Sequence, residues 1–412
     1  MHTKRRITYL LLAAGIASCS TEHAPTNVAV ESKLERLPSV PGAQPHLAKS
    51  PDGQVVVSWQ TGKASPNQLY YATLSDRGWS EPVEVTSGTN WFVNWADFPS
   101  VSPITKSLWA AHWLQKRPGG TYAYDVNMSV STDAGATWST PFSPHSDGTP
   151  TEHGFATLYP ATDGVGVIWL DGRQMSGTGH GHDGSSEGGP MTLRSATVDG
   201  NGRILNKQVV DDRVCDCCQT DVAITADGPV VIYRDRTEGE VRDIYVASSN
   251  EDGQWHNKAI SEDGWNIAGC PVNGPAIDAD QAVVVAAWFT AANNQPRVRV
   301  AWSDNAGQQF DRPIDIDADA PLGAVDIALV DNGGSAVISW LRTAKQEAEL
   351  CIRRVHRDGS LGAIQCLDQL SSRRAGVPQM VYEGPALVMA WSDATADQPS
   401  IHSARVALPP SP

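Results

Sequence analysis

The eight residues Ser131-Thr132-Asp133-Ala134-Gly135-Ala136-Thr137-Trp138 have the pattern SxDxGxxW, the most specific motif in this 412-residue chain. An Asp side chain at the start of a tight turn accepts hydrogen bonds from the backbone amides that follow it. A glycine in such a turn adopts a positive φ without steric cost. The final aromatic residue can then pack into the sheet. The motif therefore predicts a turn before an outer strand, with a structural rather than catalytic role for Asp133.

Related stretches recur later in the chain. The segment Ser303–Phe310 repeats the pattern with Asn and Phe substituting, and a degenerate copy covers Ser249 to Trp255. The recurrence indicates that the same turn is used in several copies of one structural unit.

A second repeat has a longer period. An apolar run that ends in an aromatic residue, such as Val55-Val56-Val57-Ser58-Trp59, recurs along the chain at spacings of 51 to 64 residues. The runs end at Trp59, Trp113, Trp169, Tyr233, Trp288, Trp340 and Trp391. A period of about fifty residues built from short strands is typical of a propeller or an array. Four strands fit into each unit, which is one blade. We therefore predict an all-β protein, a β-propeller of seven four-stranded blades over residues 40–408.

The SxDxGxxW turns are Asp-boxes, and with the blade period they make the chain resemble the sialidase-like (BNR-repeat) propeller superfamily. The resemblance implies a propeller fold and activity on carbohydrates. Sialidases have six blades, whereas seven aromatic-terminated strands are present, so six blades stay open as an alternative. The WD dipeptide of WD40 propellers is missing from the sequence.

The N-terminus has the pattern of an export signal. Basic residues in Met1–Arg6 precede an apolar run, residues 7–17, that is too short to span a bilayer. The run ends at Ile16-Ala17-Ser18-Cys19, which resembles a lipobox, so residues 1–18 are predicted to be a lipoprotein signal peptide and Cys19 the lipidated mature N-terminus. An ordinary secretory signal with an incidental Cys is the alternative.

Residues 19–39 are polar and without periodicity, as expected of a flexible tether. Ser20, directly after Cys19, resembles the signal for outer-membrane sorting. We expect a lipid-anchored protein of the bacterial cell envelope, in the outer membrane, that contacts the membrane only through its N-terminal lipid. The net charge of −15 argues against nucleic acid as a partner, because phosphate binding needs a basic face.

Six cysteines remain after Cys19, and an oxidising compartment favours disulfides. Cys351 and Cys366 lie equally far from the turn signal Asp358-Gly359, so they are predicted to pair across a hairpin. Cys217 is expected to pair with Cys270 or, alternatively, with its neighbour Cys218.

In a four-stranded blade the start of the inner strand and the end of the second strand lie on the same face of the propeller. The residues at these positions predict a polar site at one mouth of the central channel. They include Asp97, His153, Asp171, Arg173, Gln219, Arg234, Arg236, Arg242, Asn273 and Arg374.

Three arginines from three blades, Arg173, Arg236 and Arg374, could converge on a ligand carboxylate, which planar guanidinium groups bind through paired hydrogen bonds. The resemblance implies such a triad, although the Arg-Ile-Pro motif of sialidases is missing near the first blade. Further candidates for binding substrate are Arg234, Arg242, His153 and Asn273. Alternatively, the arginines brace blade four in ion pairs with Asp235 and Asp243.

Glycoside hydrolysis needs an acid or base and a nucleophile, and sialidases use a tyrosine as nucleophile. Asp97 and Asp171 are the candidate carboxyls, and Tyr159 is a candidate nucleophile without a convincing Glu beside it.

Two clusters have residue types that bind metals, His180-Gly181-His182-Asp183 and Cys215-Asp216-Cys217-Cys218. A mobile flap and disulfides are the simpler interpretations, so no metal or cofactor is expected. The favoured function is binding of an anionic glycan. If the protein is an enzyme, the expected activity is hydrolysis of that glycan by an exo-sialidase-like glycoside hydrolase. The alternatives are a non-catalytic binding or scaffold propeller and a copper or redox protein built on the Cys cluster.

Overall fold

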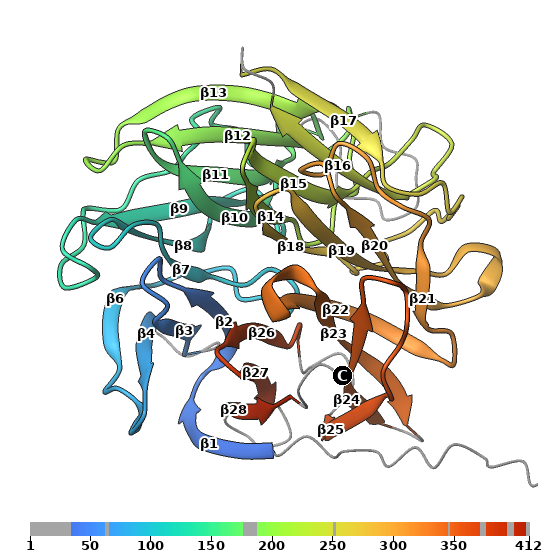
Figure 1. Ribbon diagram of the computed structural model, residues 1–412. Helices are drawn as coiled ribbons and strands as arrows, with labels where there is room; N and C mark the ends of the chain where they lie inside the picture. The colour runs from blue at the N-terminus through green and yellow to red at the C-terminus, as the bar shows by residue number, and fades with distance from the viewer. Residues whose placement is uncertain are drawn as a thin grey trace, which may run out of the picture. The chain divides into compact units, whose positions relative to one another are not determined.

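The computed structural model describes residues 34–61, 66–175, 188–249, 253–344, 347–370, 376–393 and 399–408. Within these residues the chain forms seven antiparallel sheets (Figure 1). Helical structure among them is limited to three short 3-10 turns, η1 (Arg173–Met175), η2 (Ala292–Asn294) and η3 (Asp331–Gly333). The predicted all-β fold is confirmed.

The strands repeat in the same order from blade to blade. The inner strands are β2 (Ala43–Lys49), β7 (Ser100–Pro103), β10 (His153–Ala161), β14 (Asp221–Thr225), β18 (Ala276–Asp280), β22 (Pro321–Val330) and β26 (Gln379–Glu383). The second strands are β3 (Val55–Gln60), β8 (Trp109–Lys116), β11 (Gly164–Asp171), β15 (Gly228–Arg234), β19 (Val283–Thr290), β23 (Ser335–Ala344) and β27 (Ala386–Asp393). The third strands are β4 (Asn67–Ser75), β9 (Tyr124–Ser131), β12 (Thr192–Val198), β16 (Ile244–Ser249), β20 (Arg297–Ser303), β24 (Glu347–His356) and β28 (Ser400–Ala407).

The outer position varies more. It is taken by β6 (Val83–Gly88), β13 (Ile204–Asp211), β17 (Trp255–Ala259), β21 (Ile314–Asp317), β25 (Gln365–Leu370) and, in the last blade, β1 (Leu34–Pro41). The two-residue strand β5 (Gly78–Trp79) pairs with the end of β4. In the blade of β7, β8 and β9, an isolated bridge between Met128 and Phe142 stands in the outer position.

The seven sheets form a closed propeller. Each inner strand contacts the inner strand of the next sheet, and β26 contacts β2, which closes the ring. The N-terminal strand β1 pairs with β28 from the C-terminal end of the chain, with Leu34 opposite Val406 and Pro41 opposite Ser400 (Figure 1). Seven blades are therefore confirmed, and the six-bladed alternative is wrong. Because β1 begins at Leu34, the propeller also starts within the range predicted to be a tether, and its predicted start at residue 40 is corrected.

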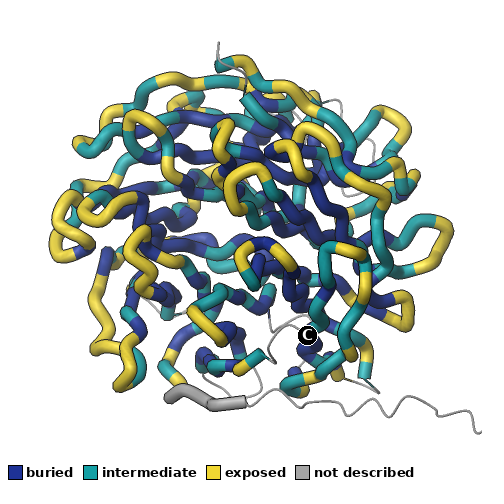
Figure 2. The backbone as a smooth tube through the Cα atoms, in the orientation of Figure 1, coloured by how far each residue is buried: buried dark blue, intermediate teal, exposed yellow. Residues whose placement is uncertain are grey.

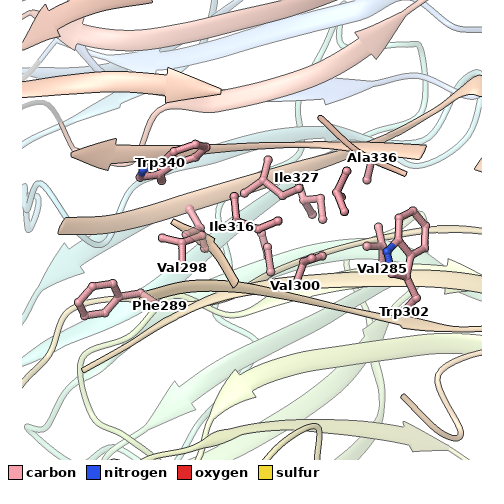
Figure 3. Packing of buried hydrophobic residues seen from close by; sticks show 14 of the residues in the cluster. Val285, Phe289, Val298, Val300, Trp302, Ile316, Ile327, Ala336 and Trp340 are labelled. Carbon is pink, nitrogen blue, oxygen red and sulfur yellow. The ribbon is translucent and has the colours of Figure 1, made fainter. Parts of the chain in front are cut away.

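The core lies between the blades. The aromatic residues that end the apolar runs are buried, and Trp59, Trp169 and Trp340 pack in clusters that include residues of the neighbouring sheet, which is the physical reason for the repeat. In Figure 2 the strands inside the propeller are coloured as buried. Figure 3 shows one such interface, where Phe289 and Trp302 of one blade and Trp340 of the next enclose aliphatic side chains. Burial of such large apolar side chains stabilises each by roughly 1.5–3 kcal/mol.

The Asp-box turns form as predicted. Asp133 Oδ1 accepts hydrogen bonds from the Thr137 amide at 2.8 Å and the Ser131 hydroxyl at 2.7 Å, and Gly135 has φ +84°. In the second copy Asn305 takes the same place, with its Oδ1 2.8 Å from the Gln309 amide. These turns follow the third strands, whereas the starts of the inner strands lie at the other end of the sheets. The Asp-boxes and the predicted site therefore lie on opposite faces.

Cys351 and Cys366 lie opposite each other on β24 and β25 and form the predicted disulfide. Cys19, Arg374, His180, His182 and Asp183 lie outside the described residues. In the described part of the chain no helix is both long enough and apolar enough to cross a membrane.

Candidate functional site

The strand register brings the predicted polar positions to one end of the propeller. His153 at the start of β10 pairs with Asp171 at the end of β11. Hydrogen bonds link the blades around this end: Asp97 Oδ1 accepts from the Phe155 amide at 2.9 Å, and Gln219 Oε1 accepts from the Gly274 amide at 2.9 Å. We call the face that carries Asp97, His153 and Gln219 the mouth. The inner strands enclose a cavity of about 310 Å³, whose lining includes Asp97 and Gln219.

A tyrosine at the mouth bridges two carboxyl groups. The Tyr124 hydroxyl oxygen lies 2.6 Å from Glu152 Oε1 and 3.1 Å from Asp97 Oδ2. Tyr124 and Asp97 are buried, whereas Glu152 is half-buried. A glycine is required beside them, because a Cβ atom on Gly154 would lie 2.1 Å from Asp97 Oδ2.

Burial dominates the protonation of these three groups. It raises the pKa of Asp97 to about 7, although hydrogen bonds from the Phe155 amide and Tyr124 oppose the shift. It raises the pKa of Glu152 to about 8, and the nearby charges of Asp97 and Asp216 contribute. The pKa of Tyr124 is well above its ordinary value, because of burial and the two carboxyls. Two carboxyls whose pKa values are raised to about 7 and about 8 therefore flank a phenol whose pKa is also raised.

The predicted catalytic residue Asp171 has a different environment. Arg173 donates two hydrogen bonds of 2.6 Å to its two oxygens, and Trp169 Nε1 donates another at 2.8 Å. Burial favours the neutral carboxyl, but these hydrogen bonds outweigh it and lower the pKa of Asp171. Asp171 is fully buried, and both of its carboxylate oxygens already accept hydrogen bonds from Trp169 and Arg173, so it stabilises the end of β11. Arg173 is held in the same bidentate pair and keeps a side chain 26% exposed.

His153 is also buried below the mouth rather than displayed in it. Its ring stacks on His145 with centroids 4.0 Å apart, and its Nε2 lies 3.2 Å from Asp147 Oδ2. Burial lowers the pKa of His145 to about 3, so this stacked partner is neutral at physiological pH. The two imidazole rings lie in the interior next to Asp171, with His153 Nε2 3.7 Å from Asp171 Oδ1. Because His153 is fully buried, it cannot contact a ligand in the mouth.

Arg234 is saturated by backbone carbonyls. It donates to the oxygens of Arg242, Asn273 and Phe289 at 2.7 to 3.1 Å, and its guanidinium lies 4.8 Å from the Trp265 ring centre. The side chain is buried, so it joins neighbouring blades instead of binding a substrate.

Arg236 and Arg242 share one carboxylate. Glu240 Oε1 accepts from Arg236 Nη2 at 2.7 Å, and its Oε2 accepts from Arg242 Nη2 at 2.9 Å. Asp216 Oδ1 lies 3.1 Å from Arg242 Nη1. The alternative interpretation expected arginines to form ion pairs that brace the fourth blade, β14–β17. Such ion pairs exist, but the carboxylates that pair with Arg236 and Arg242 are Glu240 and Asp216. The predicted partner Asp243 instead accepts hydrogen bonds from the Gly264 and Trp265 amides.

Two further predicted residues have structural roles. Asn273 Oδ1 accepts from the Ala324 amide at 2.9 Å, which links two blades at the mouth. Tyr159 lies near the far end of β10, opposite Gly166 and six residues beyond His153, within an apolar cluster. Tyr159 is therefore away from the mouth, and the structure does not bring this predicted nucleophile together with Asp97 and Asp171.

The predicted disulfide between Cys217 and Cys270 is not formed, nor is one between Cys217 and Cys218. The four cysteines Cys215, Cys217, Cys218 and Cys270 are free thiols in the structure. They nevertheless lie close together, beside Asp216.

Tyr124 and Glu152 were missed at the sequence level. Tyr124 starts a third strand and pairs with Lys116 at the end of a second strand, so third-strand starts also reach the mouth. Glu152 directly precedes β10. A search that included the starts of third strands and the residues just before inner strands would have found Tyr124 and Glu152. Their contact joins two blades, so no pattern of neighbouring residues in the sequence predicts it.

No protein-family model and no curated protein matches the chain. Among solved structures, an ulvan lyase bound to -[GlcA(1-4)Rha3S]- is similar with a TM-score of 0.58 and 11% identity, over 91% of this chain and 96% of the lyase. The polysaccharide lyase Uly1 is similar with a TM-score of 0.52 and 10% identity, over 89% of this chain and 90% of that one. Trypanosoma rangeli sialidase aligns with 84% of this chain and 59% of its own, at a TM-score of 0.46 and 13% identity. These likenesses concern the fold alone, and those to the two lyases agree with the propeller that the sequence predicts.

Proposed function

We propose that the protein is a carbohydrate-processing propeller that hydrolyses an anionic glycan at the mouth, with Glu152 as the acid–base residue. One observation carries the proposal. Tyr124 has a single hydroxyl proton, yet its oxygen lies within hydrogen-bond distance of both Asp97 and Glu152. It can donate to only one carboxyl, so the second hydrogen bond requires a proton on the other carboxyl. The site therefore holds one acid and one base at the same time.

The three residues have separate roles in this reaction. Glu152 is the half-buried member, so it is the group that donates a proton to the departing glycosidic oxygen. The water that adds to the sugar then gives one proton to the Glu152 carboxylate, which restores the acid, while Tyr124 and Asp97 are positioning residues that hold Glu152. Such proton transfer contributes typically 10²- to 10⁴-fold to the rate.

The anionic character of the substrate has two supports. Arg173 and Arg236 are paired, but their side chains stay 26% and 21% exposed. The ulvan lyase with the similar fold was solved with a ligand that contains glucuronate and a sulfated sugar.

The test is a cleavage assay on sialosides, uronate polymers, sulfated polysaccharides and neutral glycans. Both new reducing ends and unsaturated uronate products should be measured, because the second would indicate β-elimination in place of hydrolysis. We expect cleavage of an anionic substrate by the wild type and a loss of at least about 100-fold in Glu152→Gln.

A non-catalytic binding or scaffold propeller is the second candidate. It is favoured by the partners that the described mouth arginines already have, because Arg173 pairs with Asp171, Arg234 with backbone carbonyls, and Arg236 and Arg242 with Glu240. Binding of an anionic glycan without cleavage, unchanged in Glu152→Gln, would support this candidate and overturn the hydrolase.

Envelope localisation and the lipid anchor at Cys19 are proposed on the signal sequence alone. They place the mouth where exported polysaccharides are accessible.

A further inference from the structure

Three free thiols meet at the entrance to the blade of β14. Cys215 Sγ lies 3.3 Å from Cys218 Sγ and 3.8 Å from Cys217 Sγ. Cys215 and Cys218 are buried, and Cys217 is half-buried. The Cys-x-Cys-Cys spacing brings all three side chains to one point, because the chain turns sharply between β13 and β14 and the Cys215 amide donates to the Arg234 carbonyl.

A cation from the segment that precedes β16 faces this cluster. Arg242 Nη1 lies 3.3 Å from Cys215 Sγ, and the guanidinium is itself buried and held by Glu240. Apolar packing of cysteines gives no reason to bury an arginine against a sulfur atom. A positive charge at this distance stabilises thiolates, which are the form of cysteine that binds metals.

We propose that Cys215, Cys217 and Cys218 form a binding site for Cu(I). Soft thiolate ligands select Cu(I) and zinc among biological metals. Three sulfurs in one plane around an ion at about 2.3 Å lie about 4.0 Å apart, so the 3.8 Å pair already has this separation and the 3.3 Å pair needs to open by less than 1 Å. On binding, the three thiols release three protons to solvent and the copper stays in the monovalent state.

The number of sulfurs decides between the two metals. Structural zinc sites are almost always four-coordinate. The fourth cysteine, Cys270, lies near Cys217 and Asp216, is exposed, and does not belong to the group of three. Cu(I) and Zn²⁺ both have a filled d shell, but the softer, monovalent Cu(I) has the lower charge and is satisfied by two or three thiolates, so three sulfurs suit it better. The inference concerns these thiols alone and is independent of the proposed hydrolysis.

The test is a competition titration on the full-length protein in detergent under anaerobic conditions. Cu(I) is added as the metal alone against a chromophoric Cu(I) chelator, and ultraviolet thiolate-to-copper absorption is recorded. We expect one Cu(I) per chain, with three sulfur ligands by X-ray absorption. Cys217→Ser should weaken the affinity by at least about tenfold, or about 1.4 kcal/mol. Cys270→Ser is the matched control and should bind as the wild type does.

Cys217 is the variant of choice because it is half-buried, so the substituted chain should fold, which its melting temperature checks. Cys218→Ser gives a second reading of the same site. The proposal is overturned if the reduced wild type does not compete for Cu(I), or if Cys217→Ser and Cys218→Ser both bind normally. It is also overturned if protein taken from the cell envelope has a disulfide between any two of the three cysteines.

Discussion

Tyr124 and Glu152 are 28 residues apart in the chain, yet the Tyr124 hydroxyl oxygen lies 2.6 Å from Glu152 Oε1. The contact joins the start of β9 to the residue before β10, and therefore two neighbouring blades. It makes the protonation of Glu152 depend on how these blades are packed. The proposed chemistry of the site is thus a property of the closed propeller.

Glu152→Gln should remove the activity while preserving the fold. The amide keeps the size of the side chain and can still accept from Tyr124, but it has no proton to exchange. In the wild type, activity should fall as the pH rises through the pKa of Glu152, about 8, because the carboxyl then loses its proton. The measurement is the pH profile of kcat/KM. Glu81→Gln, at an exposed position, is the control. An alkaline limb that is the same in Glu152→Gln would show that another group controls the reaction.

Asp97→Asn should change how stability depends on pH. The Asp97 carboxyl has a pKa of about 7 when folded and an ordinary value of 3.8, so unfolding releases a proton between these limits. The free energy of unfolding of the wild type therefore falls as the pH rises from about 4 to about 7, by up to about 1.4 kcal/mol per unit from this group. Asn lacks this contribution and can keep both hydrogen bonds. The measurement is denaturant unfolding at pH 5 and pH 8. Between these pH values the free energy of unfolding should fall less in Asp97→Asn than in the wild type.

Asp76→Asn, at an exposed position, is the control and should show the same pH dependence as the wild type. An equal fall in Asp97→Asn and the wild type would contradict the raised pKa of Asp97.

Reducing the disulfide between Cys351 and Cys366 should destabilise the propeller by about 3 kcal/mol, the chain-entropy value for a loop of about 15 residues. Cys366 is exposed, so a reductant can reach the bond. Urea unfolding with and without reductant measures the effect. The double variant Cys351→Ala/Cys366→Ala is the control, and its stability should not respond to reductant. If reductant destabilised the double variant as much as the wild type, the effect would come from a group other than the disulfide between Cys351 and Cys366.

Replacing Cys19 with Ala should abolish lipid labelling and membrane retention. The propeller should melt at the same temperature, because its first strand begins at Leu34. Mass spectrometry of the mature N-terminus checks the processing directly. An unmodified N-terminus at another residue in the wild type would refute the lipid anchor.

The fold was predictable because its determinants are local and repeated. Trp169 and Trp288 each lie two residues before the end of a second strand, and each occupies the same kind of buried position in its blade. The Asp-box turn at Asp133 is likewise closed by residues within a few positions. Partners of the mouth residues are not local: Arg234 is held by carbonyls 39 and 55 residues away. Strand-end positions correctly placed Asp97 at the mouth, but they could not show that Tyr124 bridges it to Glu152, nor that the arginines are already paired.

Arg234 and Arg236 should respond in opposite ways to substitution. Arg234→Met removes the donors to three buried carbonyl groups while keeping most of the side-chain volume. Each carbonyl left without a partner costs about 1–3 kcal/mol, so a stability loss of at least about 3 kcal/mol is expected. Arg236 is partly exposed and paired with Glu240, so Arg236→Ala should cost about 1 kcal/mol or less. If Arg236 also meets the anionic ligand, its loss should weaken glycan affinity while the melting temperature stays nearly unchanged. Melting temperature and glycan affinity should be measured together for both variants. A large stability loss in folded Arg236→Ala with unchanged affinity would make Arg236 a blade brace like Arg234 and remove it from the proposed binding site.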